Sequence, residues 1–241
     1  MAKKRISDVL IEVLANAGIE RIYGITGDSL NSVNDSLRRN GKITFEHVRH
    51  EETAAFAAGA EASLTHKLTV CAGSSGPGNL HLINGLFDCH RNRVPVLAIA
   101  SHIPQSEVGL NYFQETHPEN LFKECSCFCE LVSNPKQMPE ILFRAMNAAV
   151  GNQDVAVIVL PGDVAVMEME IDELPVWNPP RLPHIVPQRE DIEEMAAHLE
   201  TGKRITLFCG AGCEGAHDEV VELAKRLQAP VVHAFRGKEW V

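Results

Sequence analysis

The chain has 241 residues, of which 45% are hydrophobic and 22% are charged, so it can bury a core and is not a disordered polymer. Its 22 basic and 32 acidic residues give a formal net charge of −10, which disfavours nucleic acid as a partner because phosphates would be repelled. Seven cysteines without the spacing of small secreted domains indicate a reducing, cytoplasmic location, and no window approaches the ~20 apolar residues that span a bilayer.

Helical patterns and short apolar runs alternate from the N-terminus to residue 161. Helical spacing of apolar residues predicts helices near 6–17, 29–39, 51–65, 77–90 and 135–150. The runs between them predict strands at 20–25, 43–48, 67–73, 94–100 and 155–161, several of them apolar throughout. This alternation predicts an α/β fold with a doubly wound, mostly parallel sheet flanked by helices on both faces.

The regular hydrophobic pattern ends after residue 163. Prolines and charges without sustained periodicity predict a linker over 164–188. Beyond it we expect a helix at 189–200, a strand at 204–210, a helix at 218–228 and a strand at 230–235. Two strands cannot close a doubly wound sheet, so 189–241 is interpreted as the start of a second, Rossmann-like domain in a longer protein.

A glycine-rich turn, GAGCEG at 210–215, joins the first strand and helix of that second domain. It matches the dinucleotide pattern G-x-G-x-x-G, but the following strand ends in His233 to Arg236 instead of the acidic residue that holds an NAD ribose. A flavin site or a tight turn without a ligand both remain open.

A second glycine turn precedes the helix at 77–90. Gly76 and Gly78 permit close approach of the backbone and Pro77 starts the helix, which fits either a ligand-binding turn or plain helix initiation. The long loop at 101–120 holds Phe113 and Gln114, which suits a substrate or cofactor wall, although aromatic residues often cover their own loop.

Metal-binding patterns are weak. The Gly27-Asp28-Ser29 and Gly162-Asp163 stretches resemble the start of a metal–diphosphate motif but lack its spaced asparagine. The three cysteines at 125, 127 and 129 are interpreted as ordinary thiols, because no second ligand pair lies nearby. We therefore expect no metal ligands in this chain.

Five stretches together carry a family resemblance: RIYGITGDSLN, RHEETAAFAAGAEA, GPGNLHLINGLFDCHRNRVPVLAIASHIP, YFQETHPENLF and GAGCEGAHDE. In order and spacing they resemble the thiamine diphosphate (ThDP) enzymes, and most of all the pyruvate oxidase family, also called pyruvate dehydrogenase (quinone). The resemblance implies a ThDP-binding fold. It also implies a pyrimidine-binding domain at 1–163, a linker at 164–188, an incomplete central FAD-binding domain at 189–241, and an absent C-terminal diphosphate-binding domain.

The resemblance implies an oxidoreductase that converts pyruvate to acetate and CO2 and passes electrons through FAD to a quinone. Its cofactors are ThDP, FAD and Mg²⁺, with the metal and diphosphate held by the absent domain. It implies a dimer-based homo-oligomer, a tetramer in full-length form, that is cytoplasmic and reaches the inner face of the cell membrane only through an absent C-terminal segment. Because each active site lies between subunits, the chain alone is expected to be inactive and to bind ThDP weakly.

Site residues follow from the same resemblance. Glu51 is expected to hydrogen-bond the aminopyrimidine ring, with Ala54, Ala55 and Phe56 burying it, whereas Glu52 is expected to act in helix capping. Phe113 and Gln114 are expected to line the reaction centre, and His90 to lie near substrate and flavin. The expected cofactor contacts are Gly27, Asp28, Gly76, Pro77, Gly78 and Asn79 for ThDP, and Gly210, Gly212 and Cys213 for FAD.

Two alternatives remain open. An acetolactate synthase type of carboligase also binds FAD but joins two keto acids. The residues of the stretches around 90–117 favour the oxidase. A noncatalytic assembly module that keeps the fold belongs to a different functional class.

Overall fold

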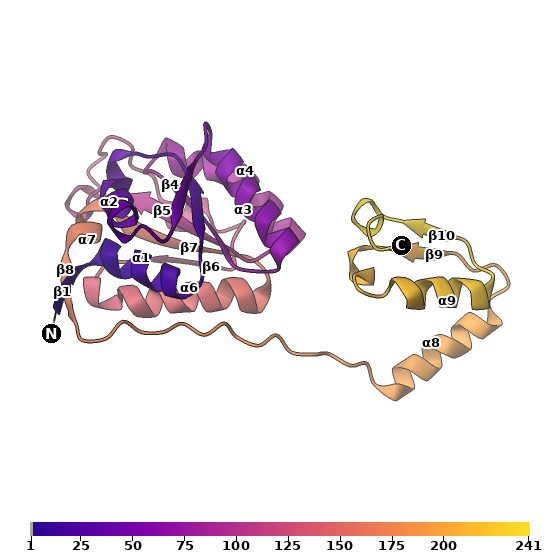
Figure 1. Ribbon diagram of the computed structural model, residues 1–241. Helices are drawn as coiled ribbons and strands as arrows, with labels where there is room; N and C mark the ends of the chain where they lie inside the picture. The colour runs from indigo at the N-terminus through magenta and orange to yellow at the C-terminus, as the bar shows by residue number, and fades with distance from the viewer. Residues whose placement is uncertain (1) are drawn as a thin grey trace. The chain divides into compact units, whose positions relative to one another are not determined.

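The computed structural model describes residues 2–241 and forms two compact units, which divide between Leu182 and Pro183 (Figure 1). The first unit is an α/β fold built on a six-stranded parallel sheet with the order β3-β2-β4-β5-β7-β6. Its strands are β2 (Arg21–Gly24), β3 (Thr44–His47), β4 (Thr69–Gly73), β5 (Val96–His102), β6 (Phe128–Leu131) and β7 (Val155–Pro161). The predicted fold class is confirmed.

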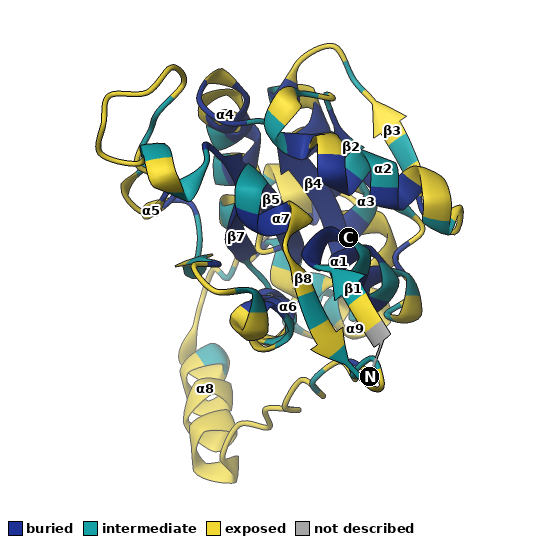
Figure 2. Cartoon of the chain, turned by 90° about the vertical axis from the view of Figure 1, so that its left-hand side faces the viewer, coloured by how far each residue is buried: buried dark blue, intermediate teal, exposed yellow. Residues whose placement is uncertain are grey.

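Helices cover both faces of this sheet. One core contains residues of α1 (Ile6–Asn16), α2 (Asn31–Asn40), α6 (Met138–Asn152) and α7 (Gly162–Val166), and the other contains residues of α3 (Glu51–Thr65) and α4 (Pro77–Asn92). Alternate residues of β5 pack into the two cores: Leu97 and Ile99 belong to the first, whereas Val96 and Ala98 belong to the second. The central strands β4, β5 and β7 are therefore buried throughout (Figure 2).

Short elements connect the sheet. They are α5 (Pro118–Leu121) and the 3-10 turns η1 (Asp28–Leu30), η2 (Gln105–Glu107) and η3 (Pro135–Gln137). The five predicted strands of this unit are all present, and β6 adds a sixth that the sequence pattern did not reveal. None of the helices within residues 2–241 is long and apolar enough to cross a membrane.

An antiparallel ribbon outside the main sheet was also not predicted. Strand β1 (Ala2–Arg5) pairs with β8 (Glu168–Ile171), so that Ala2 lies opposite Ile171 and Arg5 lies opposite Glu168. The ribbon joins the N-terminal segment of the chain to the segment that follows α7.

Part of the predicted linker over 164–188 is instead folded onto the first unit. Helix α7 extends into it, strand β8 lies within it, and Trp177 is a buried member of the first core. The indole Nε1 of Trp177 donates a hydrogen bond of 2.9 Å to Asn147 Oδ1 on α6. Burial of a large aromatic side chain outweighs the local preference of prolines and charges for an open chain, and the units divide only after Leu182.

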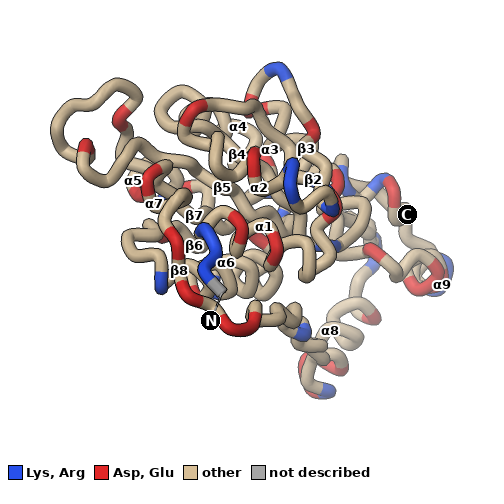
Figure 3. Tube along the Cα trace, turned by 60° about the vertical axis from the view of Figure 1, so that its left-hand side comes forward, with Lys and Arg blue, Asp and Glu red and all other residues tan. Residues whose placement is uncertain are grey.

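Charged side chains link the start of α1 to α2. Figure 3 shows basic and acidic positions along the chain trace in this region. Arg5 donates to Asp35 at 2.6 Å, and Arg39 contacts both Asp35 and Asp8. Hydrogen bonds from Arg5, and then from Arg38 and Arg39, hold the pKa of Asp35 below its ordinary value. Burial by itself raises the pKa of Asp8, but the hydrogen bonds from Ser36, Arg5 and Arg39 together lower it.

The second unit is a single βαβ unit preceded by a helix. It contains α8 (Arg189–Thr201), β9 (Leu207–Cys209), η4 (Ala211–Cys213), α9 (His217–Leu227), β10 (Val231–His233) and η5 (Phe235–Gly237). Strands β9 and β10 pair in parallel, with Leu207 opposite Val231 and Cys209 opposite His233. Neither α8 nor α9 contains a buried residue, and Phe208 is exposed. The predicted order of elements is confirmed, but their apolar faces are uncovered within the part of the chain that the structure describes.

Candidate functional site

The loops that follow β2, β4 and β5 meet at the carboxyl edge of the sheet. Ser29 joins them: its Oγ accepts from the N–H of Ser75 at 2.9 Å and lies 3.1 Å from Ser74 Oγ, while its carbonyl accepts from Ser101 Oγ at 2.6 Å. Between β2 and β4 the strand order reverses direction, because β3 lies on one side and β5 on the other. Open α/β sheets bind their ligands at such switch points.

Glu51 is a buried carboxylate at this edge. It is the first residue of α3, only 8% exposed, and the helix N-terminus favours its negative charge. Its Oε2 lies 3.2 Å from His81 Nδ1, and a Cβ added to Gly78 would lie 3.2 Å from Oε1. Phe56, which was expected to help bury it, is 38% exposed and is not among the residues of the core that contains Ala54.

Glu52 does not cap the helix. The cap is His50, whose Nδ1 accepts from the N–H of Glu52 at 3.3 Å. The Glu52 carboxylate instead accepts a hydrogen bond from Asn84 Nδ2 on α4. The expected capping role of Glu52 is therefore replaced by a link between α3 and α4, and the two adjacent acids have different environments.

The second glycine turn is shaped around Gln114. Gly76 has a φ of +66°, and a Cβ there would lie 2.8 Å from Gln114 Cβ and 2.9 Å from its carbonyl oxygen. Ser75 Oγ also donates to Gln114 Oε1 at 3.4 Å. A side chain at 76 is excluded by both strain and space, so Gln114 packs directly on the backbone that precedes Pro77 and α4.

Two buried polar side chains beside this turn have unused hydrogen-bonding capacity. Asn79 is fully buried and donates from Nδ2 to the Ser101 carbonyl at 2.7 Å, but its Oδ1 has no partner within residues 2–241. His102, at the end of β5, is buried with its Nδ1 unpartnered, and burial lowers its pKa. Unsatisfied buried polar atoms are rare in folded proteins, so these two atoms are available to a bound ligand or water.

The structure brings several predicted site residues together and leaves others elsewhere. Gly27 packs on Ser74, because a Cβ there would lie 2.4 Å from its Oγ, and Asp28 follows on the exposed side. Glu51, Gly76, Pro77, Gly78, Asn79 and Gln114 lie at the same edge. Phe113 is 80% exposed on the loop next to Gln114.

His90 is not part of this group. It lies at the opposite end of α4 from Pro77, about 20 Å along the helix axis at 1.5 Å per residue. There its Nδ1 lies 2.8 Å from Asp154 Oδ1, at the residue before β7. Its predicted place near substrate and flavin stays a prediction that this unit alone does not support.

The predicted FAD contacts lie in the second unit. Gly210 follows β9, Gly212 and Cys213 form the turn before α9, and a Cβ at 210 or 212 would meet nothing within 4 Å. Internal packing therefore does not require these glycines, and their backbone is open to a ligand.

Two histidines were missed by the sequence analysis. His50 and His81 stack with ring centroids 4.3 Å apart and planes inclined by 25°. Together with Glu51 they form the one group of three within the described residues whose ligand atoms all lie within 4.8 Å of one another. Helical spacing offered a signal, because His81 follows Gly78 by three residues and so shares its face of α4.

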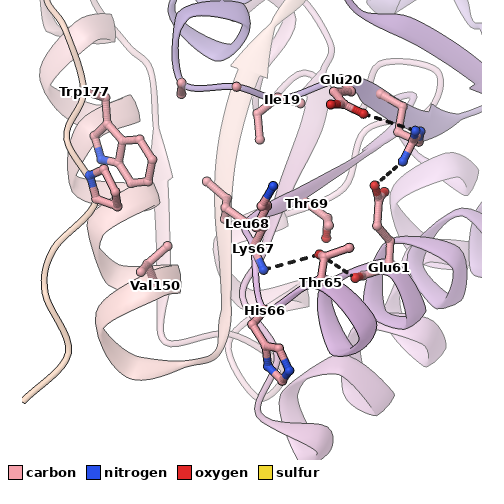
Figure 4. Close-up of a pocket in the computed structure, with 14 residues that line it drawn as sticks. Ile19, Glu20, Glu61, Thr65, His66, Lys67, Leu68, Thr69, Val150 and Trp177 are labelled. Atoms are coloured by element: carbon pink, nitrogen blue, oxygen red, sulfur yellow. Dashed lines mark hydrogen bonds and ion pairs between the residues drawn. The ribbon is translucent and has the colours of Figure 1, made fainter. Parts of the chain in front are cut away.

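A separate cavity of about 430 Å³ lies at the amino edge of the sheet (Figure 4). Its wall includes Trp177, Leu68 and an ion pair between Arg21 and Glu61, which also accepts from Tyr23. None of the predicted site residues lines it. The carboxyl edge, and not this cavity, gathers the candidate site.

Comparison with known proteins decides the family. The model of the thiamine pyrophosphate enzyme N-terminal TPP binding domain matches residues 4–121, and that of the thiamine pyrophosphate enzyme central domain matches residues 192–241. The chain belongs to the thiamine pyrophosphate enzyme family. Thiamine pyrophosphate is another name for ThDP, so the expected ThDP fold and family are confirmed at this level.

The chain is similar to curated proteins that have different names. An uncharacterized 42.6 kDa protein of Pseudomonas amyloderamosa is 59% identical over 100% of the chain and 61% of its own length. A pyruvate oxidase of Lactiplantibacillus plantarum is 31% identical over 95% of the chain and 38% of its own length. An acetolactate synthase of Arthrospira platensis is 32% identical over 98% of the chain and 43% of its own length. The chain thus spans less than two thirds of each of these relatives.

Proposed function

We propose that the chain supplies the cofactor-activating half of a ThDP- and FAD-dependent pyruvate oxidase. The proposed reaction is the oxidative decarboxylation of pyruvate to acetate and CO2, with the electrons passed through FAD to a quinone. One observation carries the proposal: a carboxylate, Glu51, is buried at the switch point of a sheet whose family binds thiamine pyrophosphate.

The residues at this edge fit an aminopyrimidine ring. Glu51 offers a carboxylate that can accept or share a proton with a ring nitrogen, and the backbone of Gly78 lies close to it, where a Cβ would be 3.2 Å from Oε1. The turn at Gly76 and the amide of Gln114 provide further polar groups at this edge. When bound, ThDP supplies the electron sink that decarboxylation of a 2-keto acid needs.

The chain's own residues then have separate tasks. Glu51 holds the proton at the ring nitrogen, and His81, 3.2 Å away, orients the carboxylate. Gln114 and the exposed Phe113 are proposed to contact substrate. The open backbone at Gly210 and Gly212 is proposed to approach the FAD phosphates, and the metal is proposed to be Mg²⁺ held outside this chain.

A second candidate is an acetolactate synthase type of carboligase, which the relative from Arthrospira platensis favours by its similar identity. The two reactions differ in their products. The oxidase releases acetate and reduces an acceptor, whereas the carboligase joins two pyruvate molecules and leaves an added quinone unreduced.

The test uses the native reading frame that encodes this chain, expressed in full and supplied with ThDP, FAD, Mg²⁺, pyruvate and a soluble quinone. We expect acetate in proportion to reduced quinone, and acetolactate without quinone reduction would replace the oxidase by the carboligase. Glu51→Gln should lower kcat by about 10²- to 10⁴-fold, the usual range for a lost general acid–base group. Glu52→Gln is the matched control and should retain near-normal activity; equal losses in both variants would refute the role given to Glu51.

A further inference from the structure

The cluster of His50, Glu51 and His81 has the composition of a transition-metal site. It offers two imidazoles and one carboxylate, and these ligand atoms lie within 4.8 Å of one another. Two histidines with a glutamate are the protein ligands of one class of catalytic zinc site, which leaves a fourth position to water. Imidazole also selects zinc, copper and nickel over magnesium, which prefers oxygen ligands.

The geometry of the cluster is close to what such an ion needs. Ligand atoms about 2.1 Å from a tetrahedral zinc are separated by roughly 3.4 Å. Glu51 Oε2 and His81 Nδ1 are already 3.2 Å apart, and the carboxylate is held by burial at the start of α3. The two imidazoles are exposed and stacked, so the remaining movement falls on side chains at the surface.

We propose that His50, Glu51 and His81 bind one divalent transition-metal ion of the zinc type. The ion takes the carboxylate that the aminopyrimidine needs, so it opposes cofactor binding at the same edge. That inhibitory consequence rests on the proposed function, whereas metal binding itself does not.

The direct test is calorimetric titration of the 241-residue chain with Zn²⁺, without ThDP or pyruvate. Cys127, Cys129 and Cys213 are first alkylated with iodoacetamide, because accessible thiols would bind the same ion. We expect one Zn²⁺ per chain, with affinity falling as pH is lowered because protons compete for the imidazoles.

Three variants locate the site. His81→Ala and His50→Asn should each weaken Zn²⁺ binding at least tenfold, since even partners outside the ligand shell contribute 10- to 100-fold. Asparagine at 50 keeps a good helix cap while removing the imidazole, so a folding defect cannot explain its effect. His47→Ala, on β3, removes an exposed histidine outside the cluster and should leave binding unchanged.

Two results would overturn the inference: no Zn²⁺ binding at millimolar concentration, or equal binding by the parent chain, His81→Ala and His50→Asn. Neither result bears on the activity assay of the proposed function. Conversely, if the activity assay refutes the oxidase proposal, a measured Zn²⁺ site remains.

Discussion

The close contact between α3 and α4 at Gly85 should contribute to the stability of the first unit. It should also fix the position of Glu51, which is the first residue of α3. A Cβ added to Gly85 would lie 2.6 Å from Ala55 Cβ, 2.7 Å from the Glu52 carbonyl oxygen and 3.0 Å from the Phe56 nitrogen. Carbon atoms in contact prefer about 3.5–4.0 Å, so one helix has to move by roughly 1 Å. Two of the three obstacles are backbone atoms within the first two turns of α3, which begins at Glu51.

Gly85→Ala therefore sets an overpacking cost of about 1–3 kcal/mol against a gain in helix propensity of about 1 kcal/mol. We expect a net destabilisation of up to about 2 kcal/mol, which lowers Tm by up to about 8 °C for a unit of this size. Gly151→Ala is the matched control, because it is also a helical glycine but a Cβ there would meet nothing within 4 Å. It should raise stability by up to about 1 kcal/mol.

The assay is urea and thermal unfolding followed by Trp177 fluorescence in a Trp240→Phe background, so that only the first unit reports. Opposite signs for the two alanine variants are expected. If Gly85→Ala is as stable as Gly151→Ala, the helices are not in the close contact described, and the position inferred for Glu51 beside Gly78 loses its support.

Two further predictions concern titrating side chains. Burial raises the pKa of Cys89 to about 12 and holds that of Cys71 well above its usual range. At pH 8 an aromatic disulfide reagent should therefore modify the exposed Cys127 first, and Cys71 and Cys89 only in urea. Rapid labelling of Cys71 in the folded chain would contradict the buried core. The pKa of Asp8 is lower in the folded chain than its ordinary value of 3.8, so its stabilisation is present above that value and is lost as pH falls through the folded pKa. Asp8→Asn should therefore lose less stability than the parent chain between pH 5 and pH 2 in urea titrations, and an unchanged pH slope would refute the role of the network around it.

The strands that periodicity found are those buried on both faces. β7 is apolar throughout and β5 is apolar from Val96 to Ala100, because alternate residues of each strand pack into the two cores. Such apolar runs are easily recognised in a sequence. β6 is only half-buried and includes Glu130, so its pattern resembles a loop. β1 and β8 pair across more than 160 residues, and nothing local in either segment specifies that partner.

Prediction from the sequence has the same limit at the candidate site: it does not find contacts between distant segments. The resemblance singled out Glu51 over Glu52, and the structure gives the physical difference: one carboxylate is buried at the sheet edge and the other bonds Asn84. The nearness of His81 depends on how tightly α3 packs against α4, which a sequence spacing of 30 residues does not reveal. The length of α4 alone separates His90 from this group.

The β1–β8 ribbon gives the first unit a particular response to mechanical load. Ala2 pairs with Ile171, so the two points where the chain enters and leaves the ribbon face each other across its first rung. A pull applied at Ala2 and at Ile171 would open this rung first and then the next, instead of shearing all the rungs at once. Beyond Ile171, however, the chain continues to Trp177, which is buried in the first core and bonded to Asn147 on α6. A load applied from beyond Leu182 therefore has to detach this indole before it reaches the ribbon.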